Sequence, residues 1–159
     1  MANPVKLLKL KPTGFQFIQE VPINAPPAKV WKTLLNSKSW FYFPNGRDDG
    51  ATIEPHLGGR FSSISRDGKI ADLHGIVTHI EPQKLLRIQG AMGASHLPVI
   101  TAMIFELQPK KGGKGTLLRF CQRTFGYLTS DLQANYQGGW ATLFKQLKQV
   151  AEGKGSKRK

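Results

Sequence analysis

Hydrophobic and polar residues alternate along most of the chain, and this period of two is typical of β-strands with one buried face. The first such segment, residues 15–23, has Phe15, Phe17 and Val21 at odd positions with polar residues between them. Short connections between the segments indicate an antiparallel meander of about seven strands. The same pattern predicts further strands at residues 51–56, 60–65, 70–80, 85–89, 99–107 and 116–124.

Turn residues specify several connections in this meander. Gly58 and Gly59 predict a bulge or tight bend before the strand at residues 60–65. Asp67 and Gly68 carry the signature of a type I′ hairpin, which needs a positive φ at both central residues. The glycine-rich segment after residue 109 is predicted to be a hairpin loop and not a phosphate loop, because it lacks GK[ST] and no helix follows it.

Helical spacing follows the first strand. The Pro26–Pro27 pair ends that strand and suits the first turn of a helix, where a missing backbone N–H costs nothing. Hydrophobic residues at three- and four-residue steps then predict a short amphipathic helix that ends near Asn36. Residues 37–43 are predicted to form a second short helix or turn, with an aromatic cluster from Trp40 to Tyr42.

The strongest helical pattern covers residues 131–152. Ser130 and Gln133 have the spacing of a capping box, in which each side chain reaches the other residue's free backbone N–H. At 1.5 Å per residue the helix would be about 33 Å long, enough to lie across a whole sheet. Gly153 is typical of the residue that follows a helix. The hydrophobic stripe consists of Leu132, Tyr136, Gly139, Trp140, Leu143, Leu147 and Val150.

Gly138 and Gly139 lie in the middle of this helix, where each should cost about 1 kcal/mol relative to alanine. Two interpretations fit the pair. Either the helix backbone packs closely on the sheet, or the pair and Trp140 form one wall of a cavity. A dry cavity of about 300 Å³ would cost several kcal/mol. A cavity at this position therefore implies a bound apolar ligand, ordered water or a fold that tolerates the loss.

Composition and charge narrow the classes of function. The 159 residues are 40% hydrophobic and 21% charged, which indicates one globular domain that needs no metal or disulfide to fold. The net charge is +13, but ten basic residues fall in a flexible leader (residues 1–14), the loop at 110–115 and a disordered tail (153–159), so the remaining body carries +3. Nucleic-acid binding is expected only as a weak, salt-sensitive contact of the basic ends.

The single cysteine, Cys121, excludes an intrachain disulfide and favours a reducing compartment. Its place in a predicted strand indicates a small buried residue. We expect a cytoplasmic protein, because the sequence contains no signal peptide pattern and no apolar run of the length that a membrane helix needs. We expect no cofactor and no metal, because no ligand spacing is present and His74 and His79 face opposite sides of a regular strand.

The order of the predicted elements, together with several short motifs, resembles one superfamily. APPAKVW at residues 25–31 resembles the opening of its first helix, and Trp40 falls where a second tryptophan is usual. The other motifs are GGRF at 58–61, DG at 67–68, GIV at 75–77, IEP at 80–82, and GWATL at 139–143 with Leu147. With these motifs in this order, the segment 15–152 resembles the START-like (SRPBCC) superfamily, and most of all its branch related to the C-terminal domain of the activator of heat-shock-protein-90 ATPase.

The resemblance implies an α+β helix-grip fold, a curved antiparallel sheet of about seven strands wrapped around a long C-terminal helix, with two short helices after the first strand. It also implies an apolar cavity between sheet and helix. Such domains bind a lipid, sterol or polyketide-like molecule more often than they catalyse a reaction, so we expect non-covalent binding of a small hydrophobic ligand. The residues expected at the cavity are Trp40, Tyr42, Phe61, His74, Met103, Phe105, Tyr136 and Trp140.

Two other functions stay open. Asp72 and His74 are two residues apart on a predicted strand, so their side chains face one side and could form an Asp–His pair. That pair would suit the general base of a cyclase or dehydratase, and it also fits a solvent-facing pair with no catalytic role. A protein-interaction role, such as that of a chaperone co-regulator, is the third hypothesis and rests on the family resemblance.

Overall fold

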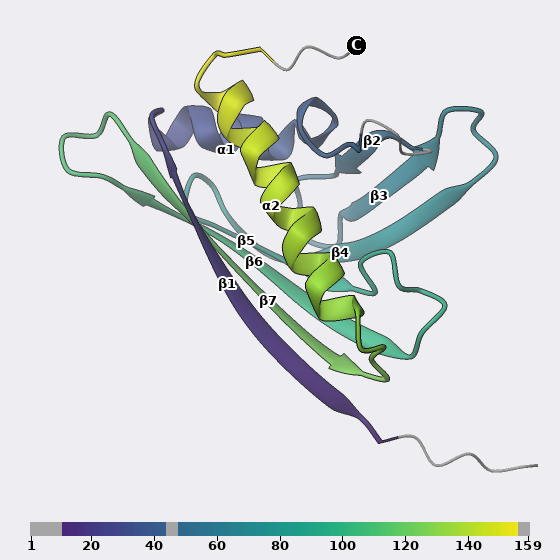
Figure 1. The fold of residues 1–159 in the computed structure, drawn as a ribbon. Helices are drawn as coiled ribbons and strands as arrows, with labels where there is room; N and C mark the ends of the chain where they lie inside the picture. Colours follow the sequence, from purple (N-terminus) through teal and green to yellow (C-terminus); the bar gives the residue numbers. More distant parts are fainter. Residues whose placement is uncertain (1–10, 44–47, 156–159) are drawn as a thin grey trace, which may run out of the picture.

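The computed structural model describes residues 11–43 and 48–155, in which a single antiparallel sheet is crossed by one long helix (Figure 1). Residues 1–10 of the predicted leader and 156–159 of the predicted tail lie outside the described residues. The helical elements are α1 (Pro27–Leu35), the 3-10 helix η1 (Ser37–Ser39) and α2 (Leu132–Ala151). The strands are β1 (Thr13–Ile23), β2 (Asp48–Ile53), β3 (Arg60–Ser65), β4 (Ala71–Glu81), β5 (Leu85–Gly90), β6 (Val99–Pro109) and β7 (Thr116–Gly126).

The strands lie in the order β1-β7-β6-β5-β4-β3-β2, so strands that are consecutive in the chain, from β2 to β7, are neighbours in the sheet. Short hairpin connections favour this arrangement, because antiparallel neighbours need only a few linking residues. Strand β1 pairs with β7, in continuous register from Thr13 opposite Gly126 to Ile23 opposite Thr116. The predicted helix-grip architecture is therefore confirmed, and the sequence placed the elements to within a few residues.

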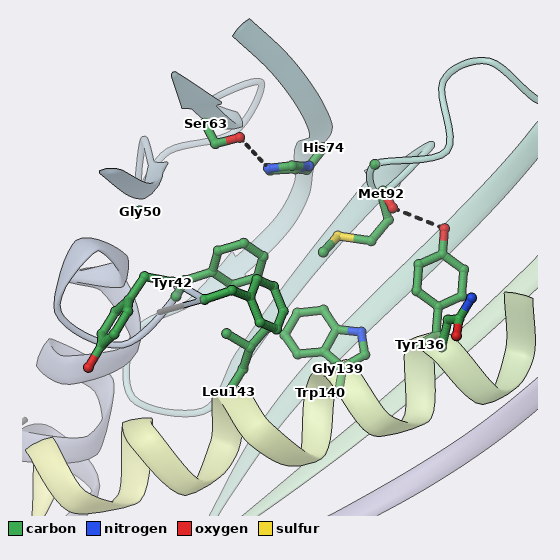
Figure 2. Close-up of a pocket in the computed structure, with 13 residues that line it drawn as sticks. Tyr42, Gly50, Ser63, His74, Met92, Tyr136, Gly139, Trp140 and Leu143 are labelled. Carbon is green, nitrogen blue, oxygen red and sulfur yellow. Dashed lines mark hydrogen bonds between the residues drawn. The ribbon is translucent and has the colours of Figure 1, made fainter. Parts of the chain in front are cut away.

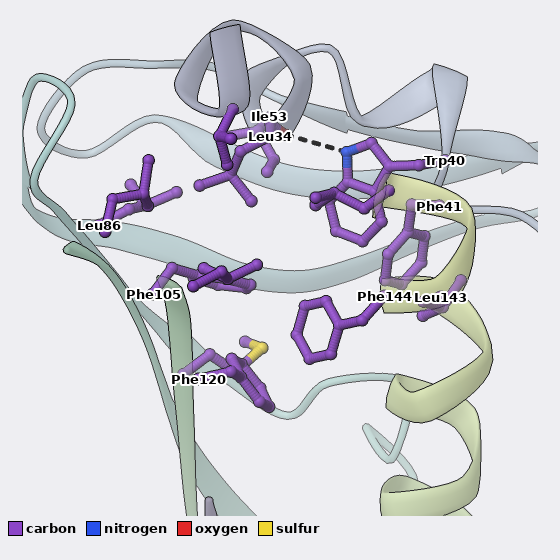
Figure 3. Close-up of a cluster of buried hydrophobic side chains, with 14 of the residues drawn as sticks. Leu34, Trp40, Phe41, Ile53, Leu86, Phe105, Phe120, Leu143 and Phe144 are labelled. Carbon is purple, nitrogen blue, oxygen red and sulfur yellow. Dashed lines mark hydrogen bonds between the residues drawn. The ribbon is translucent and has the colours of Figure 1, made fainter. Parts of the chain in front are cut away.

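The hydrophobic core lies between the sheet and the C-terminal half of α2 (Figure 3). Phe105 and Phe120 come from neighbouring strands, and their ring centroids are 4.9 Å apart. Trp140 and Phe144 of α2 are stacked at 5.2 Å, and the Trp140 ring lies 4.4 Å from that of Phe120. The buried residues of α2 run from Trp140 to Ala151, and no residue of the helix before Trp140 is buried. The N-terminal half of the helix is therefore packed less tightly on the sheet, which it contacts through Tyr136 against Phe15 and through a hydrogen bond from Gln19 to the Gln137 carbonyl.

The C-terminal end of α2 is tied to the junction of β1 and α1. The Glu152 carboxylate accepts a hydrogen bond of 2.9 Å from the Asn24 N–H and pairs with Lys148 Nζ at 2.8 Å. Lys148 also donates to the Pro22 carbonyl oxygen. The Asn24 N–H and then the lysines lower the pKa of Glu152 to about 2. This anchor fixes one end of the helix.

The capping box predicted for α2 is wrong. The helix begins one residue later than expected, so Asp131 and not Ser130 is its N-cap. Asp131 itself has a helical backbone, with φ −94° and ψ −12°, and no side chain caps the helix. Gln133 then stands two residues after the N-cap, where the reciprocal bond of a capping box does not form.

The sequence predicts a tight bend at Gly58–Gly59 and a type I′ turn at Asp67–Gly68; the structure contains the bend, but the turn has another geometry. At Gly59 a Cβ atom would lie 2.1 Å from the Glu54 carbonyl oxygen, which confirms a tight bend that excludes a side chain. The β3–β4 turn is not of type I′, because Gly68 has a positive φ of 71° and Asp67 does not. Instead, Asp67 accepts a hydrogen bond of 2.6 Å from the Ser65 hydroxyl and fixes a longer loop.

Three further predictions bear on function. Cys121 is 5% exposed within β7, so it is a small buried residue as predicted. The glycine-rich segment connects β6 to β7 as a hairpin loop. None of the helices in the described part of the chain is long and apolar enough to cross a membrane.

Candidate ligand-binding site

A pocket of about 230 Å³ opens between the N-terminal half of α2 and the sheet (Figure 2). Four parts of the chain form its walls: α2, the segment after η1 with the start of β2, the β3–β4 pair, and the loop after β5. The lining residues are Phe41, Tyr42, Phe43, Gly50, Ser63, His74, Met92, Gly93, Asn135, Tyr136, Gly139, Trp140 and Leu143.

The glycine pair of α2 decides between the two interpretations of its role. A Cβ on Gly138 would have no atom of the protein within 4 Å, and a Cβ on Gly139 would meet only Phe43 Cζ, at 3.8 Å. Close packing on the sheet is therefore wrong for this pair. Gly139 lines the pocket and leaves space there, whereas Gly138 is exposed on the other side. The helix therefore has no side chain at the position of Gly139, where it faces the pocket.

An irregularity in β4 aims His74 into the pocket. The pairing with β3 passes from Leu73 directly to Gly75, so His74 is the extra residue of a β-bulge. The His74 residue is 6% exposed, and its Nε2 is hydrogen-bonded to Ser63 Oγ at 3.0 Å (Figure 2). Asp72 is half-buried and lies opposite Ser63 in the register of the two strands. Action of Asp72 and His74 together as a base stays a prediction.

Strands β4 and β5 approach very closely beside this bulge. A Cβ on Gly75 would lie 2.7 Å from the Gln89 carbonyl oxygen, and one on Gly90 would lie 2.4 Å from the His74 carbonyl oxygen. Only glycine fits at both positions. The Met92 N–H then donates to the His74 carbonyl oxygen at 2.9 Å, which fixes the loop after β5 at the edge of the pocket.

Tyr136 ties the same loop to α2. Its hydroxyl lies 3.0 Å from the Met92 carbonyl oxygen and 3.2 Å from that of Ala91, and donates to them. Burial raises the pKa of the Tyr136 hydroxyl, so the group stays a donor at neutral pH. Met92 has a φ of 44°, a left-handed conformation that residues other than glycine seldom adopt. The tyrosine therefore holds the loop in a strained form.

A chain of buried polar groups sets the orientation of Trp140. Its indole N–H donates to Gln122 Oε1 at 2.6 Å, and Gln122 Nε2 donates to Thr124 Oγ1 at 3.1 Å. The hydroxyl of Thr124 is in turn hydrogen-bonded to that of Thr101 at 3.0 Å. An unpaired buried polar atom costs about 1–3 kcal/mol, so this series of hydrogen bonds favours one position of the Trp140 indole ring, which lines the pocket.

The structure brings half of the predicted cavity residues together at this pocket. The other half are core residues that other side chains separate from the pocket. Phe105 packs against Trp140 of α2, and the ring of Phe61 lies behind those of Phe41 and His74. Contact of any of the eight with a ligand stays a prediction. Those that line the pocket are Tyr42, His74, Tyr136 and Trp140. Those that are 0% exposed and do not line it are Trp40, Phe61, Met103 and Phe105.

Sequence reasoning missed several lining residues. Ser63 shares a strand face with Phe61 by simple alternation, and that signal could have found it. Phe43 and Met92 lie in irregular segments, where no periodicity tells which way a side chain points. Asn135 lies on the helix one residue before Tyr136, outside the predicted stripe.

The chemistry open to this lining is apolar contact and neutral hydrogen bonding. None of the lining residues is Asp, Glu, Lys or Arg, and His74 is the one that ordinarily titrates near neutral pH. Among the residues that the structure describes, no group of three or more His, Cys, Asp and Glu side chains could hold a metal ion. His79 pairs with Glu81 at 3.0 Å, away from the pocket lining.

An antiparallel sheet that grips a long C-terminal helix, with a pocket between them, defines the helix-grip class of START-like (SRPBCC) domains. The chain belongs to the family described as "Activator of Hsp90 ATPase homolog 1-like protein", whose model matches residues 24–152. The resemblance inferred from the motifs is thereby confirmed. No curated protein matches the sequence significantly.

Solved structures share the fold at low sequence identity. EF2215 from Enterococcus faecalis is 23% identical, with a TM-score of 0.65 over 91% of this chain and 75% of that one. SA2116 from Staphylococcus aureus is 15% identical, with a TM-score of 0.68 over 91% and 97% of the two chains. The Aha1 dimer from Colwellia psychrerythraea is 22% identical, with a TM-score of 0.61 over 87% and 96%. Identities this low establish the fold alone.

Proposed function

We propose that the protein binds a small hydrophobic molecule non-covalently in the pocket between the sheet and α2. The observation that carries this proposal is the space of about 230 Å³ beside Gly139, which the surrounding aromatic and aliphatic side chains leave unfilled. Filling such a space with the protein's own side chains would be worth about 5 kcal/mol at ~24 cal/mol per Å³. The chain forgoes this stabilisation and also has a glycine, Gly139, in the helix wall of the pocket.

Water in this pocket has few partners, because most of the lining is apolar. An apolar ligand would release that water and bury its own surface, so apolar burial supplies most of the affinity. His74, with its bond to Ser63, supplies a polar group that can orient the ligand. Tyr136 contributes little to orientation, since its hydroxyl already donates to the loop after β5.

Native mass spectrometry of freshly purified protein tests this function by revealing a small molecule that copurifies. The matched variants are Gly139→Leu, which places a side chain in the pocket, and Gly138→Leu, which places it in open space. We expect the bound mass in the wild type and in Gly138→Leu and its loss from Gly139→Leu. A ligand retained by a folded Gly139→Leu protein would contradict the proposal.

A catalytic role is a second candidate, favoured by the burial of His74 in the pocket and its bond to Ser63. In that case His74 would act as a general base on the bound molecule, in a cyclase or dehydratase type of reaction, with Asp72 as its neighbour. The substrate would then lose the mass of one water in a dehydration, or keep its mass and change its chromatographic retention in a cyclisation, when incubated with the wild type. A His74→Ala variant should bind it without changing it, and unchanged turnover in this variant would remove the candidate.

A protein partner is a third candidate, favoured by membership of a family named after an Hsp90 ATPase activator. Its test is the ATPase rate of an Hsp90 with and without this protein. No stimulation and no complex at low salt would count against it. Either role fits a cytoplasmic protein, which the single buried cysteine also favours.

A further inference from the structure

We infer that the pocket selects an aromatic molecule of one or two fused rings that carries no negative charge and whose single hydrogen-bonding group lies at Ser63 and His74. This inference rests on the proposed function and names the chemical class of the ligand. It excludes the long-chain lipids and the sterols that the family resemblance allows.

The size of the pocket limits the ligand. An apolar cavity of about 150 Å³ accommodates benzene, and pockets for drug-sized ligands begin at about 300 Å³. The space of about 230 Å³ lies between these values. It therefore accommodates one ring with substituents or two fused rings, and most of a four-ring sterol would remain in solvent.

The charge of the lining disfavours anionic ligands. None of the thirteen lining residues carries an ammonium or a guanidinium group. A carboxylate placed there would lose hydration and gain no Lys or Arg partner, which is the costly case of charge burial. The half-buried Asp72, opposite Ser63, would further disfavour an anion at the sheet side of the pocket.

The shape of the walls favours a flat molecule. On the α2 side, Gly139 presents backbone without a side chain, so a planar ring can lie directly against the helix. The rings of Phe41 and Trp140 are 5.8 Å apart in an edge arrangement, and that of Phe41 lies 5.7 Å from His74. Aromatic side chains at such angles offer faces and edges to a further ring.

The polar groups of the pocket point to one anchor. The Ser63 hydroxyl and the His74 imidazole meet at 3.0 Å on the sheet side, across the pocket from α2. A hydroxyl has one donor and two acceptor positions, so the pair can take a further hydrogen bond from a ligand. The Tyr136 hydroxyl already donates its hydrogen bond to the carbonyl oxygens of Ala91 and Met92. A phenol-like group on the ligand therefore fits best at Ser63 and His74.

Three probes of nearly equal size separate these requirements: naphthalene, 2-naphthol and 2-naphthoate. Each is titrated into the full-length protein at pH 7, and the backbone amide shifts of Ser63 and Gly139 report binding at the pocket. We expect 2-naphthol to bind tightest. Naphthalene should bind about 5–10-fold more weakly because it lacks the hydrogen bond. The naphthoate anion should bind at least about 100-fold more weakly because its charge is buried without a partner.

Two serines of β3 provide a matched pair of variants. Ser63 lines the pocket, and its neighbour Ser62 has its side chain on the other face of the strand. Ser63→Ala should bring the affinity for 2-naphthol to within about 3-fold of that for naphthalene, and Ser62→Ala should leave the wild-type ratio unchanged. If Ser63→Ala does not fold, the ratio between the two probes in the wild type decides the point.

Palmitate and cholesterol in the same titration distinguish the failure of this inference from failure of the proposed function. If either of them shifts the pocket amides and binds more tightly than 2-naphthol, the small aromatic ligand is wrong and the pocket is still a ligand site. If 2-naphthoate binds as tightly as 2-naphthol, the inference is also overturned. If no probe binds and no molecule copurifies, the proposed function fails with it.

Discussion

Replacing Gly138 by alanine should stabilise the protein by about 1 kcal/mol, the helix-propensity difference between the two residues. This value is the whole expected effect, because a Cβ at this position would have no neighbour within 4 Å beyond the helix's own backbone and so adds neither a clash nor a packing contact. Gly138 lies in the interior of α2, six residues after its first residue, Leu132. The change therefore acts on the helix backbone and on the freedom of the unfolded chain.

Urea unfolding followed by circular dichroism measures this effect. The midpoint should rise with no change in the slope, and the melting temperature should rise by about 2–4 °C for a chain of this length. Gly139→Ala is the matched variant: its Cβ would lie 3.8 Å from Phe43 Cζ, an ordinary contact, so it should stabilise the fold by a similar amount while narrowing the pocket. Ligand affinity should therefore fall for Gly139→Ala and stay constant for Gly138→Ala. A Gly138→Ala protein less stable than the wild type would refute the reasoning.

Three other substitutions test the contacts around the pocket and the helix anchor. Gln122→Leu leaves the indole N–H of Trp140 unpaired in the core, so the free energy of unfolding should fall by about 1–3 kcal/mol; a change under about 0.5 kcal/mol in urea unfolding would contradict the role of this bond. Tyr136→Phe removes the hydroxyl that donates to the Met92 carbonyl, so amide exchange in the loop after β5 should speed up while that of β7 stays constant. Glu152→Gln removes a carboxylate whose folded pKa is about 2, against 4.5 for an unperturbed one. The stabilisation from this carboxylate is complete above pH 4.5 and is lost as the pH falls towards 2, because the unfolded chain takes up the proton first. The urea midpoint should therefore fall more steeply across that window in the wild type than in Glu152→Gln, and equal slopes would argue against the anchor.

The family and the elements of the fold could be predicted because their signals are local. Alternation along residues such as Phe15 to Ile23, and the stripe from Trp140 to Leu147, depend on near neighbours in the chain, and a period of two or of 3.6 identifies strand or helix directly. The glycine pair at 138–139 lies in the same helical segment, so the sequence already raised the alternative of a cavity wall in α2.

Other features depended on contacts between distant segments, and these only the tertiary structure decided. The bulge at His74 exists because β4 must pair with β3 on one side and approach β5 closely on the other, which no single strand encodes. The start of α2 at Leu132 was likewise not given by the local pattern of Ser130 and Gln133. Which of the predicted inward residues line the pocket also depended on contacts between distant segments. Phe61 is fully buried behind the rings of Phe41 and His74, whereas His74 itself lines the pocket, because the packing of side chains from several elements, and not the strand pattern, determines which residues reach the open space.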